Sequence, residues 1–224
     1  MAQTPLLPRT DSELQRLETA VQTYSSAIFL ADEYLSARGI GEEVRLGSRL
    51  GVCEDPLPGH EAYQGMLCIP YLGADDQPLT VRFRCIENHS CKEKGHGKYR
   101  TLPHDHARLY NVRALLQAMA LGDGDINIAE GEMDAIILTQ LGLHAIALPG
   151  ANQWQRHHAK ALAGFERIYL WADPDDGGDQ MAEAILPTLR QAQRVRLYDG
   201  DVNEVYLKYG EKGIYEAMQR LTWA

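Results

Sequence analysis

The stretch that decides the fold is RIYLWADPDDGGD, residues 167–179, in which an apolar run leads directly into four carboxylates. The apolar run predicts a buried strand, and the Asp and Gly residues after it predict a turn into a helix. Carboxylates this close repel one another, so the cluster indicates either a bound cation or a solvated turn whose Asp caps a helix. The rest of the chain has to distinguish these two interpretations.

Three other short apolar segments also predict strands, and together they predict a parallel sheet. INIAE (126–130), HAIALPG (144–150) and RVRLYDG (194–200) alternate with helical patterns at 132–142, 154–164 and 179–192. Strands that alternate with helices form parallel sheets with right-handed crossovers. The expected fold class is therefore α/β, with a mostly parallel four-stranded sheet flanked by helices in the C-terminal half.

The N-terminal half has a different pattern, which predicts an α+β subdomain. Thr10 and Glu13 form a capping-box signature, and the helical pattern after it runs to about Ala37. MLCIPYLGADDQPLTVRFR (66–84) predicts a hairpin, and RLYNVRALLQAMALG (108–122) predicts a helix that ends at Gly122. We place the domain boundary between residues 122 and 123, with an N-terminal subdomain at 1–122 and a metal-binding domain with a C-terminal helix at 123–224.

Carboxylates follow the predicted strands at the points where ligands gather in open α/β sheets. Glu130 ends the first strand, Asp173 and Asp175 follow the third, and Asp201 follows the fourth. Asp134 lies one helical turn after Glu130 and can face the same edge. Mg²⁺ prefers oxygen ligands, and two such ions can clamp a phosphoryl transfer. A lone solvated turn would not explain acids at several strand ends.

Basic residues are concentrated in one part of a chain that is acidic overall. The net charge of −9 argues against a nonspecific nucleic-acid binder. Residues 82–113, however, include eight basic residues and only three acidic ones. The candidate contacts to a polyanion in this strip are Arg82, Arg84, Lys98, Tyr99, Arg100 and Arg108. The alternative is an ordinary solvated surface. The sequence has no P-loop motif.

Four potential soft ligands lie in the Gly/His/Lys-rich loop after the hairpin. Cys85, His89, Cys91 and His96 could hold Zn²⁺, or the loop could be a polar segment that faces nucleic acid. The other two cysteines, Cys53 and Cys68, are expected to be small core residues. The irregular spacing of the four cysteines and the lack of an export signal predict a cytoplasmic protein without a disulfide framework. No apolar stretch approaches the ~20 residues that a membrane span needs.

Several quoted segments resemble a known family. AEGEMDAI (129–136) followed by WADPDDGGD (171–179) resembles the Toprim domain, which carries a Glu after its first strand and a D-x-D after its third. EYLSARGI (33–40), CIPYLGADDQPLTVRFR (68–84), KYR (98–100) and ARLYNVRAL (107–115) resemble, in order, segments of the catalytic core of bacterial DnaG-type primases. The chain looks most like the primases of actinobacterial phages.

This resemblance implies residues, cofactors and partners. Glu130, Asp173 and Asp175 would be the catalytic metal ligands for Mg²⁺ or Mn²⁺, with Asp134 and Asp201 in support. Asn203 stands where the family has a further acid, and we do not expect it to bind metal. The implied partners are a single-stranded DNA template, ribonucleoside triphosphates and an RNA primer. A zinc-bearing subunit or a replicative helicase is also expected, because neither family module is recognised in this sequence.

The resulting prediction is a DNA primase catalytic core that makes RNA primers by metal-dependent nucleotidyl transfer, in a bacterial host cytoplasm if a phage encodes it. Two alternatives remain open at this stage. A Toprim nuclease would hydrolyse nucleic acid with the same acids, and a noncatalytic subunit would only bind the template.

Overall fold

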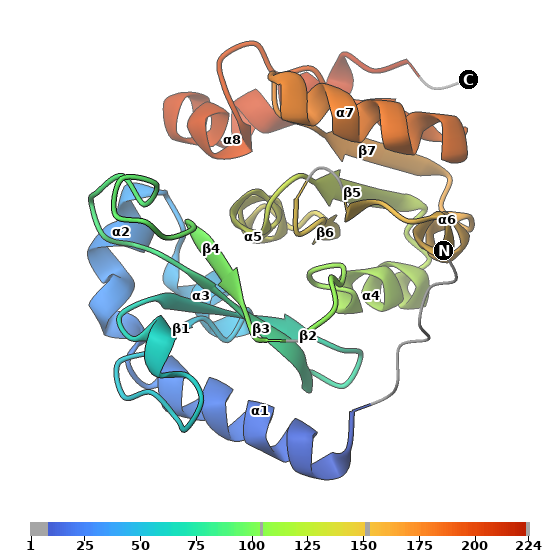
Figure 1. The fold of residues 1–224 in the computed structure, drawn as a ribbon. Helices are drawn as coiled ribbons and strands as arrows, with labels where there is room; N and C mark the ends of the chain where they lie inside the picture. The colour runs from blue at the N-terminus through green and yellow to red at the C-terminus, as the bar shows by residue number, and fades with distance from the viewer. Residues whose placement is uncertain (1–8, 104, 151–152, 223–224) are drawn as a thin grey trace. The chain divides into compact units, whose positions relative to one another are not determined.

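The computed structural model describes residues 9–103, 105–150 and 153–222. They form two compact units, one of residues up to 34 together with 45–107, and one of residues 35–44 together with 108 onward. Residues 108–122, which the sequence pattern grouped with the N-terminal half, thus pack in the second unit. The predicted α/β class is confirmed, including the parallel four-stranded sheet with flanking helices (Figure 1).

The first unit is an antiparallel sheet covered by a long helix. The sheet has the order β1-β2-β3-β4, with strands β1 (Gly51–Val52), β2 (Leu67–Leu72), β3 (Pro78–Arg84) and β4 (Tyr99–Thr101). β2 and β3 are the predicted hairpin. Helix α1 (Asp11–Ser25) begins at Thr10 with the predicted capping box, and it buries Leu17, Val21 and Tyr24 against Val81 and Phe83 of β3.

The first helix is shorter than the sequence pattern suggests. α1 ends at Ser25, and a 3-10 turn (Ile28–Ala31) and helix α2 (Asp32–Ala37) follow it in place of one continuous helix. The Ser26 hydroxyl donates to the carbonyl of Thr23, and a Ser that bonds to the backbone competes with the helical ladder. Helix α3 (Glu42–Gly47) and a 3-10 turn (Glu61–Tyr63) complete the segment before the hairpin.

The second unit is a parallel sheet of order β6-β5-β7-β8 with helices on both faces. Its strands are β5 (Asp125–Ala129), β6 (Ala145–Ala147), β7 (Arg167–Trp171) and β8 (Ala192–Arg194). Its helices are α4 (Arg113–Leu121), α5 (Glu132–Gln140), α6 (Arg156–Leu162), α7 (Asp176–Ile185) and α8 (Val202–Gln219), with a 3-10 turn (Leu186–Thr188) after α7. α8 is kinked at Gly210, whose φ is 66°.

Hydrophobic side chains on alternate positions of β5 and β7 form the main core of this unit. Ile126, Ile128, Ile168 and Leu170 pack with residues of α4, α6 and α7. α5 packs on β5, β6 and α8. Asn127, which alternation places on the side away from Ile126 and Ile128, is buried and accepts a 2.8 Å hydrogen bond from the Trp171 indole.

The fourth strand lies earlier in the chain than its predicted position. The sequence suggested a strand at 194–200, whereas β8 spans Ala192–Arg194 and Arg194 pairs with Leu170. One further bond, from Val195 N to Leu170 O at 2.9 Å, ends the pairing. Val195 and Leu197 lie beyond the end of β8 and are both buried, so burial rather than strand geometry accounts for their alternating pattern.

Residues 35–44 are attached to the second unit by reciprocal hydrogen bonds. Arg38 Nη1 donates to Asn203 Oδ1 at 3.0 Å, and Asn203 Nδ2 donates to the Arg38 carbonyl at 2.6 Å. Gln140 makes a similar pair, because it accepts from Gly41 N at 2.6 Å and donates to Gly39 O at 2.9 Å. These bonds fix the segment against α5 and α8.

Candidate metal centre and nucleic-acid interface

The strand order creates a switch point at the carboxyl edge of the parallel sheet. The chain passes from β5 to its neighbour β6 and then crosses over β5 to form β7 on the other side. In open α/β sheets this point is where the crevice for ligands lies. Glu130 directly follows β5, and Asp173 and Asp175 follow β7. The fold therefore brings acids from two distant segments to one place.

Hydrogen bonds and a close approach define the arrangement of these three acids. Glu130 Oε2 accepts from Asp173 N at 3.3 Å, and Asp175 Oδ1 caps α7 by accepting from Gly178 N at 2.9 Å. A Cβ added at Gly177 would lie 3.3 Å from Glu130 Oε1 and 3.2 Å from Asp175 Oδ1. The absence of a side chain at Gly177 thus keeps the space between these two oxygens open.

The acids raise one another's proton affinity. Burial, followed by the charges of Glu130, Asp201, Asp175 and Glu204, raises the pKa of Asp173 to about 7. Burial also raises the pKa of Glu130, and the Asp175 charge adds to this effect. Mutual repulsion of carboxylates in a partly desolvated site has this result whenever no cation is present.

The donor set fits a hard divalent cation. Glu130, Asp173 and Asp175 supply only oxygen ligands, and none of them forms an ion pair with a basic side chain in the part of the chain that the structure describes. Mg²⁺ and Mn²⁺ prefer such ligands, and Mg²⁺ retains several waters. A partly exposed, oxygen-only, uncompensated cluster meets these requirements.

The other two predicted acids occupy different positions from one another. Asp201 is the N-cap of α8, where its Oδ1 accepts a hydrogen bond from Glu204 N at 2.8 Å. Its negative charge helps to raise the pKa of Asp173. Asp134 is 9% exposed, and its Oδ1 accepts from Asn203 N at 3.3 Å. One oxygen of Asp134 therefore ties α5 to α8. Asn203 is buried and serves the Arg38 contact described above.

Two residues at this edge were missed by the sequence analysis. Arg194 Nη2 donates to the Asp173 carbonyl at 2.6 Å, and its Nη1 pairs with Asp179. Arg194 thereby fixes the backbone that carries Asp173, and its charge lowers the pKa of Glu130. Glu204 adds a negative charge near Asp173. The signal for Glu204 was its place three residues after Asp201, where a capping box has its acid.

Two arginines of β3 and one tyrosine of β4 form a stacked group in the first unit. Arg84 pairs across the strands with Tyr99, and the Arg82 guanidinium lies 4.4 Å from the centre of the Tyr99 ring. Arg84 is only 4% exposed, and it donates to the hydroxyls of Tyr34, at 2.6 Å, and Tyr99. Arg84 is therefore held inside this group, whereas Arg82 is half-buried above the Tyr99 ring.

The other three predicted basic residues are outside this stacked group. Arg100 pairs with Phe83, so it lies on the opposite face of the sheet, where it covers the Tyr63 ring at 5.0 Å and donates to the Ala62 carbonyl. Lys98 is exposed just before β4. Arg108 belongs to the second unit. Strand alternation thus separates Arg100 from Arg82 and Arg84, although the three are close in sequence.

The loop between β3 and β4 contains a Cys/His cluster that could hold a metal. One ligand atom from each of Cys85, His89, Cys91 and His96 can be chosen so that all four lie within 4.8 Å of one another. All four side chains predicted from the sequence are therefore brought together. Cys53 and Cys68 are buried elsewhere in the first unit.

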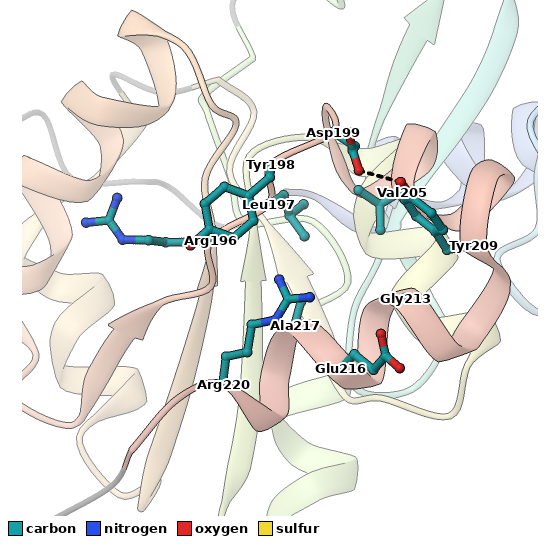
Figure 2. Close-up of a pocket in the computed structure, with 10 residues that line it drawn as sticks. All are labelled: Arg196, Leu197, Tyr198, Asp199, Val205, Tyr209, Gly213, Glu216, Ala217 and Arg220. Carbon is teal, nitrogen blue, oxygen red and sulfur yellow. Dashed lines mark hydrogen bonds between the residues drawn. The ribbon is translucent and has the colours of Figure 1, made fainter.

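A separate cavity of about 260 Å³ lies between residues 196–199 and α8 (Figure 2). Tyr209 closes one side of it by donating a 2.6 Å hydrogen bond to Asp199, and Arg220 borders it from the end of α8. None of the five predicted metal-ligating acids lines this cavity. It is therefore distinct from the carboxylate cluster.

Comparison with known proteins agrees with this geometry. A family model described as Toprim-like matches residues 127–206. The gene 57 protein of Mycobacterium phage D29 is 31% identical over 159 residues, which cover 69% of this chain and 98% of that protein. A DnaG primase catalytic domain bound to single-stranded DNA superposes with a TM-score of 0.74 at 19% identity, over 92% of this chain and 78% of that one.

The RNA polymerase domain of Mycobacterium tuberculosis DnaG, in complex with double-stranded DNA with a 6-nucleotide overhang, has a TM-score of 0.75 at 16% identity. The match covers 97% of this chain and 83% of that one. The chain therefore has the fold of a DnaG-type primase catalytic core and contains a Toprim-like domain. It belongs to the phage protein family that includes the gene 57 protein of Mycobacterium phage D29.

Within the described residues, every helix is too short or too polar to cross a membrane.

Proposed function

We propose that this protein is a DNA primase that joins ribonucleotides on a single-stranded DNA template. The observation that carries the proposal is the convergence of Glu130, Asp173 and Asp175 at the switch point of the parallel sheet. Three converging carboxylates without a basic partner among the described residues suit the binding of a hard cation, which in turn can bind phosphate oxygens. The Toprim-like match over the same residues and the fold of the whole chain agree with this role.

In the proposed reaction, a 3′-hydroxyl attacks the α-phosphate of a nucleotide and pyrophosphate leaves. One or two Mg²⁺ or Mn²⁺ ions held by the three acids would neutralise the charge that develops on the phosphate oxygens. The chain itself positions these acids. Asp175 is fixed as the cap of α7, Arg194 fixes the Asp173 backbone, and Gly177 keeps the space between Glu130 and Asp175 open. Asp201 and Asp134 contribute negative charge and packing, respectively.

Of the six basic-strip residues predicted from the sequence, we propose Arg82, Lys98, Tyr99, Arg100 and Arg108 as contacts to template and nucleotide. Lys98 is the member most available to a phosphate, because its side chain is exposed. Tyr99 offers an aromatic ring, but Arg82 already covers one face of it. Arg84 is buried between two tyrosines, so we assign it the task of holding Tyr99.

The proposed partners also include a primer and a second protein. We expect the chain to extend a preformed RNA primer better than it starts one, since initiation must position two nucleotides and a template at the same time. A zinc-bearing subunit or a replicative helicase would then stimulate initiation. The measurement is de novo synthesis compared with extension of an annealed oligoribonucleotide, and equal rates without stimulation would contradict this expectation.

The decisive experiment offers single-stranded DNA and ribonucleotides to the purified chain with Mg²⁺ or Mn²⁺. New oligoribonucleotides are the expected product. Shortened DNA would instead identify a Toprim nuclease, and no change in either nucleic acid would leave a template-binding subunit.

A matched pair of variants assigns any activity to the cluster. Asp173→Asn removes a charge from the converging acids, whereas Asp176→Asn removes the same charge from a nearby exposed position, the first residue of α7. Loss of activity in the first variant alone is expected. Equal activity in both variants would refute the assignment of Asp173.

A further inference from the structure

The Cys/His cluster closes the loop that joins β3 to β4. Cys85 comes directly after the last residue of β3, and His96 lies three residues before β4 begins. Cys85 N donates to Lys98 O at 2.9 Å, which continues the β3–β4 ladder into the loop. A tight turn then brings His96 back, because its N donates to the Cys91 carbonyl at 3.0 Å. The backbone of this one loop therefore brings the four ligands together.

The hydrogen bonds of the two histidine rings determine which nitrogens face the centre of the cluster. His89 Nδ1 lies 3.1 Å from Glu87 Oε2, and His96 Nδ1 lies 3.1 Å from the Gly97 carbonyl. Both of these partners are acceptors, so each Nδ1 carries the proton and each Nε2 of a neutral ring presents a lone pair. Metal-binding histidines typically have such a partner on the distal nitrogen.

Both Nε2 atoms point at the same place. His89 Nε2 and His96 Nε2 are 2.9 Å apart, and the ring planes meet at 88°. Two facing lone pairs repel unless a cation or a proton lies between them. The Cys85 sulfur lies 3.6 Å from His89 Nε2. A sulfur beside two nitrogen lone pairs is a donor set suited to a borderline-soft cation.

The separations between the ligand atoms are close to those of a tetrahedral zinc site. Zn–N bonds of about 2.05 Å and Zn–S bonds of about 2.3 Å place tetrahedral ligands about 3.4 Å apart for two nitrogens and about 3.6 Å apart for nitrogen and sulfur. The sulfur–nitrogen distance of 3.6 Å matches this, and the nitrogen–nitrogen distance of 2.9 Å requires a shift of about 0.5 Å. Cys91 supplies a fourth ligand, since all four ligand atoms lie within 4.8 Å of one another.

We propose that Cys85, His89, Cys91 and His96 bind one structural Zn²⁺ that holds the β3–β4 loop closed. Four protein ligands leave no open position, which is typical of structural rather than catalytic zinc. The ion would fix the loop at the ends of β3 and β4, and so keep Arg84 and Tyr99 in register. This site is separate from the carboxylate cluster, and the proposal holds whether or not the chain is a primase.

Metal analysis of the full chain, purified without a chelator, tests the proposal. We expect one zinc per chain, and close to none in Cys91→Ala. Cys53→Ala is the matched control, because it removes a buried thiol of the same unit that lies outside the cluster. Zinc well below one equivalent after incubation with excess Zn²⁺, or zinc retained in Cys91→Ala, would overturn the proposal and leave a hydrogen-bonded histidine pair.

A second measurement on the wild-type chain remains decisive if Cys91→Ala fails to fold. Replacement of zinc by Co²⁺ should give the visible bands of a tetrahedral site together with sulfur-to-cobalt charge transfer. Chelation should also speed tryptic cleavage after Lys92 and Lys94, which lie inside the loop, and added Zn²⁺ should restore protection. An octahedral cobalt spectrum, or a cleavage rate that does not respond to zinc, would contradict a closed Cys/His site.

Discussion

Replacement of Asp173 by asparagine should stabilise the metal-free protein at neutral pH, although it removes a proposed metal ligand. The ionised carboxylate is partly buried near Glu130, Asp175 and Asp201, and these surroundings oppose its charge. Its side chain accepts no hydrogen bond from the described residues, so asparagine of nearly the same shape loses no partner. The substitution therefore removes repulsion and leaves the packing unchanged.

The size of the effect follows from the pKa of Asp173. A rise from the ordinary 3.8 to about 7 corresponds to about 4 kcal/mol at about 1.36 kcal/mol for each tenfold change in proton affinity. Asp173 is partly exposed, so solvent screening reduces the expected gain to about 1–2 kcal/mol. For a chain of this size that gain raises the melting temperature by about 2–8 °C.

The pH dependence has a definite sign. Between pH 3.8 and about 7 the folded protein retains a proton on Asp173 that the unfolded chain has lost. Stability of the wild type therefore falls as pH rises through this window, and the whole penalty is present above it. The advantage of Asp173→Asn should be largest near pH 8 and should shrink as the pH falls toward 5.

Thermal melts of both proteins at pH 8 and pH 5.5, with a chelator and with Mg²⁺ or Mn²⁺, measure this prediction. Metal should stabilise the wild type and leave the variant nearly unchanged, which reverses their order. Asp176→Asn provides the control at an exposed position. A metal-free variant that melts below the wild type at pH 8, or a gap that does not change with pH, would refute the argument from repulsion.

Three further predictions concern activity, DNA binding and the glycines of α7. Glu130→Gln should lower primer synthesis by about 10³-fold with an unchanged circular dichroism spectrum, if the metal provides several kcal/mol; a modest loss would contradict a ligand role. Lys98→Ala should reduce the slope of log binding constant against log salt concentration for single-stranded DNA by about 0.7. The control Lys212→Ala, at an exposed position, should leave this slope unchanged. Equal slopes for Lys98→Ala and the wild type would mean that Lys98 does not contact a phosphate. Gly177→Ala should weaken Mg²⁺ binding without unfolding the protein, because its Cβ approaches two carboxylate oxygens. Gly178→Ala should instead destabilise the fold, because its Cβ would lie 2.0 Å from the Asp173 carbonyl oxygen. Similar melting temperatures for the two variants would contradict this contrast.

The parallel sheet and the acid cluster were predictable because each depends on short-range signals. The apolar run at 167–171 and its acidic end specify a buried strand and a turn, and INIAE ends in Glu130 in the same way. The sequence could not give the strand order, which places β5 beside β7. That order depends on how the crossovers pack, and it is the order that brings Glu130 to Asp173.

The basic strip was less predictable, because its members were grouped by sequence distance alone. Arg82 and Arg84 alternate with Phe83 along β3, and Arg100 pairs with Phe83 on the other face. Successive side chains of a strand point to opposite faces of the sheet, so knowledge of the β3–β4 pairing would have placed Arg100 on the face opposite Arg82 and Arg84. The burial of Arg84 had no signal, because its partners Tyr34 and Tyr99 come from segments far apart in the chain.

The shift of β8 explains why the role of Arg194 was missed. A strand at 194–200 puts Arg194 at its start, on the edge of the sheet away from the acids. A strand at Ala192–Arg194 puts it at the carboxyl end instead, where its guanidinium reaches the Asp173 carbonyl and Asp179. The apolar alternation of Val195 and Leu197 comes from burial beyond the ladder, which periodicity cannot distinguish from a strand. The position of one short strand thus decides whether the acid cluster has a basic residue beside it, and that residue supports the backbone of Asp173 without pairing with its carboxylate.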